Sequence, residues 1–264
     1  MKKQKMKLKD KVQFSIIIGI FAVIVSACVI SILHNDMTAS AEDNFRKLEQ
    51  QVSVTVPNDN VHKKENTSTI EERSYSYGHN VSTLSKKNNE CIGWLTVNDT
   101  GISYPVMQST TDHQKYLSRD FNGNYSLSGT PFLDYRCSLK SANMIIYGHH
   151  MNDGSMFGAL TNYTRKSYRD SHKTITFETR NGTKEYTVFS VMKTTVDDDW
   201  YKFVSAESAE KFCKRVAYAN EHSIYNTGLK PSMSHKLLTL STCTNASEDE
   251  RLLVIAYENL GGKK

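Results

Sequence analysis

The stretch Lys236-Leu-Leu-Thr-Leu-Ser-Thr-Cys243 decides the fold, together with Arg251 eight residues further on. Its apolar and β-branched residues end abruptly at a cysteine, which is typical of a buried strand that delivers a thiol to the edge of a sheet. The polar segment 244–250 lets the chain reverse into a second strand, Arg251-Leu-Leu-Val-Ile-Ala-Tyr257. If these strands are antiparallel neighbours, the cysteine that ends one lies beside the arginine that begins the other.

Other short apolar runs predict further strands, at residues 92–97, 102–106, 130–134, 143–147, 174–177 and 185–190. Asn181-Gly182 precedes the last of them, and this dipeptide strongly favours a hairpin. Helical patterns are short and lie at residues 112–117, 156–163 and 206–219, the last with Ala209, Phe212, Cys213 and Val216 on one apolar stripe. Because strands and helices do not alternate, the pattern predicts a mostly antiparallel, closed β structure with about eight strands and helices packed outside.

The N-terminal part of the chain has a different character. Residues 14–33 form an uncharged apolar run of 20 residues, the length that a helix needs to cross a bilayer. Six lysines and one aspartate in residues 1–13 give a charge of +5, which equals the net charge of the whole chain. The positive-inside rule therefore predicts a cytoplasmic tail at 1–13, one transmembrane anchor at 14–33 and an extracellular remainder. The basic balance indicates topology and does not predict nucleic-acid binding.

Two other interpretations of this segment are a cleaved signal peptide, with Ala39-Ser40-Ala41 as its cleavage site, and a lipoprotein box at Val25–Cys28. The apolar run is longer than that of a usual signal peptide and continues past the cysteine, so an uncleaved anchor is favoured. Residues 34–87 are expected to form a stalk and linker, because residues 57–87 hold almost no aliphatic side chains. The remaining residues, 88–264, are expected to form one globular domain.

Five cysteines are scattered along the chain without the spacing of metal ligands. An odd number in an exported chain favours at least one free thiol. Cys28 lies in the apolar segment, and Cys91, Cys137 and Cys213 are interpreted as small buried hydrophobic residues. Cys243 is then the thiol whose position asks for a chemical explanation.

A cysteine nucleophile acts as a thiolate and needs a nearby cation or histidine. Among nine histidines, only His149 and His150 follow directly on a buried strand and a glycine. If this strand neighbours those of Cys243 and Arg251, the three side chains could serve as nucleophile, proton carrier and oxyanion stabiliser in acyl transfer. From spacing alone, an inert buried thiol, a histidine in a turn and a solvated arginine remain open alternatives.

Several ordered motifs resemble those of the sortases, and in detail those of the class B branch. The resemblance covers about residues 88–260 and includes the Cys243 and Arg251 stretch already quoted. The further motifs are Gly93-Trp-Leu-Thr-Val97, Tyr104-Pro-Val-Met-Gln108, Tyr116-Leu-Ser-Arg-Asp-Phe121, Gly129-Thr-Pro-Phe-Leu-Asp-Tyr-Arg136 and Ile146-Tyr-Gly-His149.

This resemblance implies an eight-stranded β-barrel transpeptidase, anchored in the membrane of a Gram-positive bacterium. Such an enzyme cleaves an Asn-Pro-x-Thr-type sorting signal of a secreted protein after Thr. It then joins the Thr carboxyl to an amine of a peptidoglycan precursor of the lipid II type. Carried over by position, Cys243 is the nucleophile, His149 the general acid and base, and Arg251 the stabiliser of substrate or oxyanion. The family's reaction needs no metal or organic cofactor, and His150 is expected to be a bystander.

The resemblance also marks five residues that are expected to contact the substrate: Leu117, Ser241, Trp200, Tyr201 and His113. Ordinary packing is the alternative for each of them, and His113 departs from the Asn that relatives often carry. A pilin polymerase, with a lysine as acceptor, remains an alternative function. A non-catalytic envelope binding module is disfavoured by the intact triad, and an L,D-transpeptidase by the separation of 94 positions from His149 to Cys243.

Overall fold

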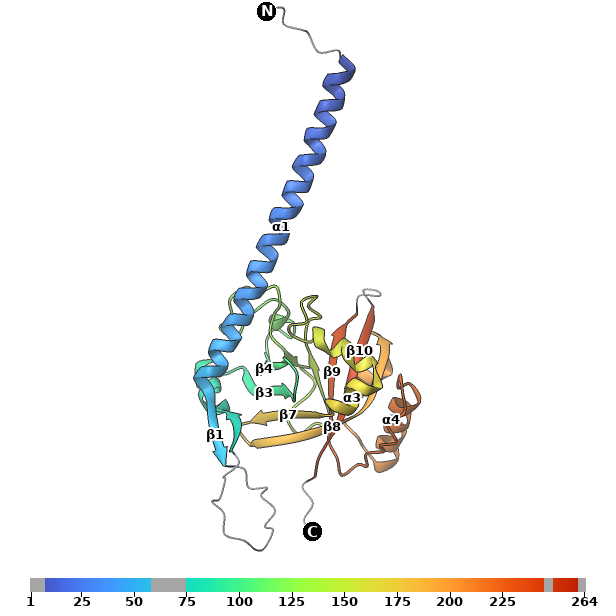
Figure 1. Ribbon diagram of the computed structural model, residues 1–264. Helices are drawn as coiled ribbons and strands as arrows, with labels where there is room; N and C mark the ends of the chain where they lie inside the picture. The colour runs from blue at the N-terminus through green and yellow to red at the C-terminus, as the bar shows by residue number, and fades with distance from the viewer. Residues whose placement is uncertain (1–7, 58–74, 245–248, 261–264) are drawn as a thin grey trace, which may run out of the picture.

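The computed structural model describes residues 8–57, 75–244 and 249–260. A long N-terminal helix projects from a β-barrel whose outside carries several short helices (Figure 1). The helices, with η for the 3-10 form, are α1 (Leu8–Val52), α2 (Val81–Lys87), η1 (Lys115–Leu117), η2 (Gly158–Thr164), α3 (Lys166–Ser171), η3 (Asp199–Lys202) and α4 (Ala209–Glu221). The strands are β1 (Ser53–Pro57), β2 (Tyr75–His79), β3 (Cys91–Val97), β4 (Ser103–Met107), β5 (Phe132–Leu133), β6 (Asn143–Tyr147), β7 (Thr174–Thr179), β8 (Gly182–Thr195), β9 (Leu237–Cys243) and β10 (Glu250–Glu258).

Eight of these strands close into a barrel in the order β10-β8-β7-β3-β4-β5-β6-β9. All neighbours are antiparallel except the pairs β4–β5 and β6–β9. The predicted hairpin between β7 and β8 is present, with Thr179 paired to Gly182. The mostly antiparallel, closed structure expected from the sequence is therefore confirmed.

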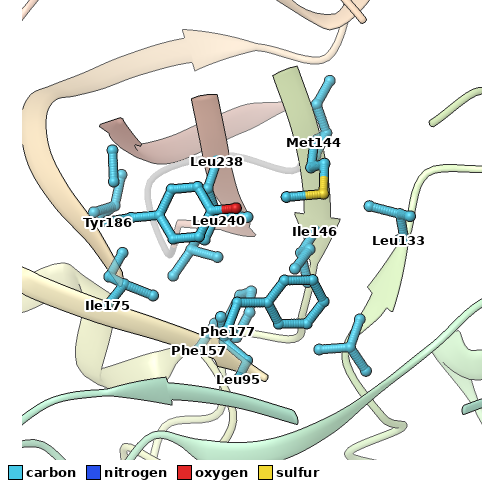
Figure 2. Close-up of a cluster of buried hydrophobic side chains, with 14 of the residues drawn as sticks. Leu95, Leu133, Met144, Ile146, Phe157, Ile175, Phe177, Tyr186, Leu238 and Leu240 are labelled. Carbon is cyan, nitrogen blue, oxygen red and sulfur yellow. The ribbon is translucent and has the colours of Figure 1, made fainter. Parts of the chain in front are cut away.

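The inside of the barrel is filled by apolar side chains from all round the wall (Figure 2). Leu238 and Leu240 of β9 point into this core and are fully buried. The opposite face of β9 is buried as well, because Trp200 of η3 covers it and donates from Nε1 to Thr239 Oγ1 at 3.1 Å. Burial on both faces explains why β9 reads as an unbroken apolar and β-branched run rather than as an alternating one.

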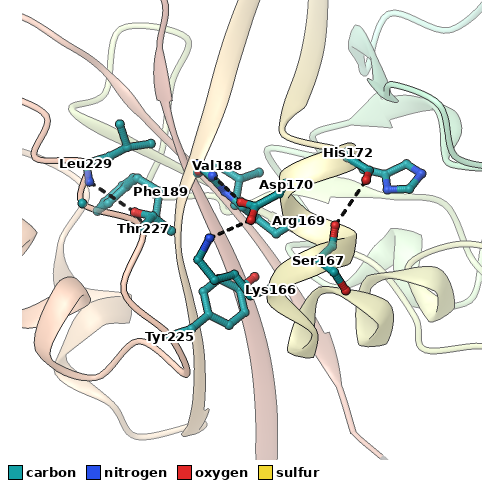
Figure 3. Close-up of polar contacts among 12 residues, drawn as sticks. Lys166, Ser167, Arg169, Asp170, His172, Val188, Phe189, Tyr225, Thr227 and Leu229 are labelled. Atoms are coloured by element: carbon teal, nitrogen blue, oxygen red, sulfur yellow. Dashed lines mark hydrogen bonds and ion pairs between the residues drawn. The ribbon is translucent and has the colours of Figure 1, made fainter.

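Helix α3 is attached to the outside of the barrel by a buried arginine. Arg169 is 7% exposed, and its Nε donates to the Val188 carbonyl of β8 at 2.9 Å. Asp170 accepts from both Arg169 and Lys166, and Thr227 donates to the Phe189 carbonyl nearby (Figure 3). Two backbone carbonyls of β8 thus find partners in the covering segments.

Helix α4 packs on the barrel through Phe212, Val216 and Ala219. Cys213, which was predicted to share this buried face, is exposed, and the prediction is wrong. Each residue turns the helix by about 100°, so a residue that directly follows the buried Phe212 points away from the barrel. The chain therefore presents a second accessible thiol outside the apolar N-terminal segment.

The first part of α1 coincides with the predicted anchor. Over the described residues, one helix is long and apolar enough to cross a membrane, and it lies within Val23–Val52. The large apolar side chains from Val23 to Leu33 are exposed, as they would be in a lipid-facing helix. The predicted cytoplasmic tail lies in part outside the described residues, because the structure begins at Leu8.

Part of the expected stalk and linker has regular structure. Helix α1 continues without a break to Val52, and β1 and β2 pair antiparallel beyond it. Helix α2 follows, capped by the side chain of Asn80, and buries Val81 and Leu84 against the barrel. Two aliphatic residues spaced three apart are enough to dock so short a helix, which explains why the polar composition did not predict it. The central part of the predicted linker, residues 58–74, lies outside the described residues.

Candidate active site

The strand order places three distant segments side by side at one end of the barrel. Strand β9 lies between β6 and β10, and Cys243 is paired directly with Arg251. On the other side, Tyr147 pairs with Ser241, and the next amide along β6 still donates to the Ser241 carbonyl at 3.1 Å. His149 lies two residues beyond this pair, as Cys243 does on β9. The backbone of Cys243 therefore runs between the His149 segment and Arg251.

A groove of about 930 Å³ opens at this end of the barrel, and Cys243, His149 and Arg251 all line it. Each of the three is partly exposed, so the groove reaches their side chains. The structure thus brings together the thiol, imidazole and guanidinium that the sequence placed far apart in the chain. The sequence alone left open whether these three side chains meet, and in the structure they line one groove.

The orientation of His149 is set by its backbone and by one carbonyl. Its Nε2 lies 2.7 Å from the Leu117 carbonyl, and a carbonyl only accepts, so Nε2 carries the hydrogen. Its own carbonyl accepts from the Phe157 amide at 2.9 Å. Gly148 precedes it because a Cβ there would lie 2.7 Å from ring carbons of Phe157. The Leu117 carbonyl therefore holds the imidazole, and the Phe157 amide holds the backbone that carries it.

The backbone segment that carries the Leu117 carbonyl packs closely on Gly129, where a Cβ would lie 2.7 Å from the Leu117 oxygen. Gly129 has a φ of +59°, and a Cβ there would lie 2.4 Å from the Tyr116 carbonyl. The next amide, that of Thr130, donates to the same carbonyl at 2.9 Å. Only glycine allows this approach, which explains the Gly129-Thr130 pair in the sequence motif.

The groove wall contains a buried acid, Asp134, that the sequence patterns do not single out. Asp134 is 4% exposed and accepts from Arg136 Nη2 at 2.6 Å and from Tyr147 OH at 2.8 Å. Burial alone would raise the pKa of this carboxyl, but the hydrogen bonds from Arg136 and Tyr147 hold it below its usual value. The signal for it was present: an aspartate directly after the β5 run, at a strand end.

Four of the five residues expected to contact substrate line the groove: Leu117, Ser241, Tyr201 and His113. Ser241 Oγ and Tyr201 OH are 2.8 Å apart, and burial raises the pKa of Tyr201 to about 12. The ring of His113 stacks on Tyr135 with a centroid distance of 3.9 Å. The fifth, Trp200, is fully buried beneath β9 and is not among the residues lining the groove. Its indole serves to cover the strand.

Two further polar groups lie close to this end of the barrel. Among the described residues, His150 Nδ1 and Thr242 Oγ1 are buried side-chain atoms without a hydrogen-bond partner. The backbone of His150 forms a bridge with Met156, inside the loop that follows β6.

No group of three or more acidic, histidine or cysteine side chains suited to a metal occurs within the described part of the chain.

Comparison with known proteins now defines the class. The family model "Sortase domain" matches residues 95–259. Sortase B of Staphylococcus aureus (strain NCTC 8325 / PS 47) is 33% identical over 178 residues, which are 66% of this chain and 72% of that protein. Sortase B of Listeria monocytogenes (serovar 1/2a, strain ATCC BAA-679 / EGD-e) is 34% identical over 172 residues, 64% of this chain and 68% of that protein.

A solved substrate complex of Staphylococcus aureus sortase B superposes with a TM-score of 0.64 and 32% identity, covering 69% of this chain and 85% of the other. The sortase B relatives identify the chain as a cysteine transpeptidase, and its closed eight-stranded barrel has a groove lined by a cysteine, a histidine and an arginine. The chain belongs to the sortase family, and within it to class B. The alternatives of a non-catalytic binding module and of an L,D-transpeptidase are therefore set aside.

Proposed function

We propose that Cys243 attacks the Thr carbonyl of an Asn-Pro-x-Thr-type sorting signal and forms a thioester. The peptide bond after Thr breaks, and the departing amine takes a proton from His149. An acceptor amine then attacks the thioester and gives a proton back to His149, and Cys243 leaves as a thiolate. The single observation that carries this assignment is the register that sets Cys243 between the His149 segment and Arg251.

His149 is suited to carry this proton because one ring nitrogen orients the imidazole while the other can face the substrate. Among the described residues, the hydrogen bond given for the ring is the one from Nε2. Nε2 donates to the Leu117 carbonyl, so Nδ1 is the nitrogen proposed to exchange a proton with the substrate. A ring fixed in this way loses little freedom when the reaction begins.

Arg251 is proposed to stabilise the charge that develops on the attacked carbonyl oxygen. It stands opposite Cys243 in the ladder, and its Nη1 donates to the Glu250 carbonyl at 3.0 Å, which orients the guanidinium. A guanidinium offers five hydrogens in a rigid plane, and this geometry suits donation to a carbonyl oxygen that gains charge. Such donors stabilise a transition state most when they are positioned beforehand.

The groove is proposed to bind the sorting signal of a secreted protein. It is open enough for an extended peptide, and the related Staphylococcus aureus enzyme was solved with a substrate. Leu117, Tyr201, Ser241 and His113 are the proposed contacts, because they line the same groove as Cys243. The stacked pair of His113 and Tyr135 offers a flat surface to a substrate side chain.

The proposed acceptor is an amine of a lipid II-type peptidoglycan precursor, which places the reaction at the outer face of the membrane. Helix α1 supports a single-pass anchor, with the lysine-rich end inside and the barrel outside. A pilin lysine is the alternative acceptor. A peptide crosslink to lysine, found by mass spectrometry of products formed in cells, would select it over the wall amine.

The test uses the full chain in detergent with a small library of Asn-Pro-x-Thr peptides. Triglycine serves as acceptor, since a related sortase B has been solved in complex with it. Cleavage after Thr and transfer to triglycine are expected for the wild type, and Cys243→Ala should abolish both. Cys213→Ala is the matched control and should leave the rates unchanged, because that thiol lies on α4. Undiminished cleavage by Cys243→Ala would refute the assignment.

A further inference from the structure

The last turns of α1 are packed on the barrel. Thr38, Ala41, Phe45 and Val52 are all buried, and their spacing of three to seven residues places them on one face of the helix. The ring of Phe45 meets that of Tyr104 edge-on, with 5.4 Å between centroids. This end of α1 is thus part of the folded domain and more than a tether to the N-terminal segment.

Tyr104 of β4 links this helix to a second segment. Its ring is 1% exposed, and its hydroxyl lies 3.0 and 3.1 Å from the two carboxylate oxygens of Glu42 in α1. The same hydroxyl accepts from the Met156 amide at 3.0 Å. Burial, and then the charge of Glu42, raise the pKa of Tyr104, so the hydroxyl keeps the proton that it donates.

Met156 belongs to the loop that carries His149. Its φ of +50° is unusual for a residue with a side chain, and it needs support from the surroundings. Its backbone bridges that of His150, and the neighbouring Phe157 amide bonds the His149 carbonyl. The ring of Phe157 also fills the space beside Gly148. A displacement of the Met156 amide is therefore passed to His149 through the bridge to His150 and through the bond from the Phe157 amide.

We propose that the barrel-packed end of α1 positions His149 through the series Glu42, Tyr104 and Met156. The inference rests on the proposed role of His149 in proton transfer. Glu42 and Tyr104 are positioning residues, because neither is among the residues that line the groove. The consequence is that full activity requires docked α1, so a barrel that has lost this helix holds its histidine less well.

The first test measures hydrogen exchange at the Met156 amide in the full chain in detergent micelles, without peptide. Tyr104→Phe removes the acceptor and keeps the buried ring, so exchange at this amide should become at least about fivefold faster. Glu42→Ala leaves the tyrosine in place and should give a smaller increase. Asp43→Asn is the matched control, because Asp43 pairs with Lys47 on the exposed face of the same helix.

The second test asks whether the loosened loop moves the imidazole. The ring resonances of His149, assigned with His149→Gln, should shift in Tyr104→Phe and stay in place in Asp43→Asn. With the peptide substrate, kcat should fall about fivefold to tenfold in Tyr104→Phe while KM changes less than twofold. A smaller folded fraction would also lower the apparent kcat at unchanged KM, so kcat is calculated per folded molecule from the fraction folded measured by circular dichroism.

Two results would overturn the proposal. One is unchanged exchange at the Met156 amide, and the other is faster exchange with unaltered His149 resonances and kcat. Exchange and resonances are read without substrate, so they decide the positioning role independently of the reaction. If the wild type fails to cleave any peptide, the proposed function falls, while the link from α1 to His149 is still judged by these two measurements.

Discussion

At the scale of single residues, Gly148 controls where His149 lies. A methyl group there would stand 2.7 Å from carbons of the Phe157 ring, which is fully buried and has little room to move. We expect Gly148→Ala to displace the backbone before His149, at a cost of about 1 to 3 kcal/mol in the free energy of unfolding. Transpeptidation should fall by at least about tenfold, because small displacements in an active site are costly.

The control for this change is Gly101→Ala, since nothing lies within 4 Å of a Cβ at that position. Thermal unfolding and kcat/KM are measured for both variants. Equal activity of the two would show that the Gly148–Phe157 contact does not hold the histidine.

The five cysteines should differ sharply in reactivity. Burial raises the pKa of Cys91 to about 12 and that of Cys137 to about 11, so at pH 8 both remain thiols and are also shielded. Cys28 and Cys213 are exposed. In a Cys28→Ser, Cys213→Ser background, a methanethiosulfonate reagent should therefore modify one thiol per chain and abolish activity in step with labelling.

Mass spectrometry of the labelled chain locates the modification. It should disappear when Cys243→Ala is added to the same background. Modification of Cys91 or Cys137 under native conditions would contradict the burial of these side chains.

At the scale of elements, the strands were predicted more accurately than the segments held by distant contacts. The β6 run 143–147 was found to the residue because its burial is visible in the sequence itself. The helix expected from Met156 begins instead at Gly158, because the Met156 amide is taken by Tyr104 and its backbone is left-handed. A local sequence pattern at Met156 cannot predict a hydrogen bond to Tyr104, which lies 52 positions earlier in the chain.

The candidate site shows the same division. Cys243 and His149 were singled out because each ends a buried strand, and strand ends can be read from periodicity. The Asp134 cluster and the Leu117 carbonyl depend on how loops fold back over the barrel, which periodicity does not describe. Trp200 was assigned to the groove by resemblance alone, whereas its burial follows from the need to cover β9.

His79 of β2 joins three elements through a buried charged cluster. Its Nδ1 lies 2.9 Å from Glu178 of β7 and its Nε2 3.3 Å from Glu49 of α1, and its ring stacks on Trp94 of β3. Burial alone would lower the pKa of this imidazole, but the hydrogen bonds of Glu178 and Glu49 outweigh it and raise the pKa. Only the doubly protonated ring donates to both carboxylates.

The direction of the pH effect follows from this raised pKa. The stabilisation is complete below the unfolded value of about 6.5 and is lost as the pH rises through the folded pKa. We expect His79→Gln to lower the free energy of unfolding by about 1 kcal/mol at pH 6 and by less at pH 9. His222→Gln, at the exposed end of α4, is the control. A loss that is equal at both pH values would show that the ring is not charged in the folded state.

At the scale of the whole molecule, the start of α1 and the end of β10 lie on opposite sides of the barrel (Figure 1). Strand β10 runs from Arg251 towards the C terminus, so the Cys243 end of β9 lies on the side from which α1 projects. If α1 is the membrane anchor, the groove faces the bilayer. This orientation suits an acceptor amine that is held on a lipid.

The distance from the bilayer would be set by α1, which is continuous from Leu8 to Val52. Between the end of the apolar run at Leu33 and the buried Ala41, the helix rises by only about 12 Å. A nine-residue Gly-Gly-Ser insertion after Asn35 would keep the docked face and release this fixed height. We expect transfer to a soluble amine to stay within twofold, and transfer to a lipid-linked amine in the same vesicle to fall several-fold.

Both acceptors are offered to the full chain reconstituted in vesicles, and products are separated by their lipid tail. An insertion of nine alanine-rich helical residues at the same position is the control, because it preserves stiffness while it raises the barrel by about 13 Å. If height matters, the helical insertion also lowers transfer to the lipid-linked amine, whereas a need for stiffness alone predicts normal transfer. A groove that α1 holds at a fixed height must respond to at least one of the two insertions. Equal transfer rates for both insertions and the wild type would therefore show that α1 does not set the position of the groove.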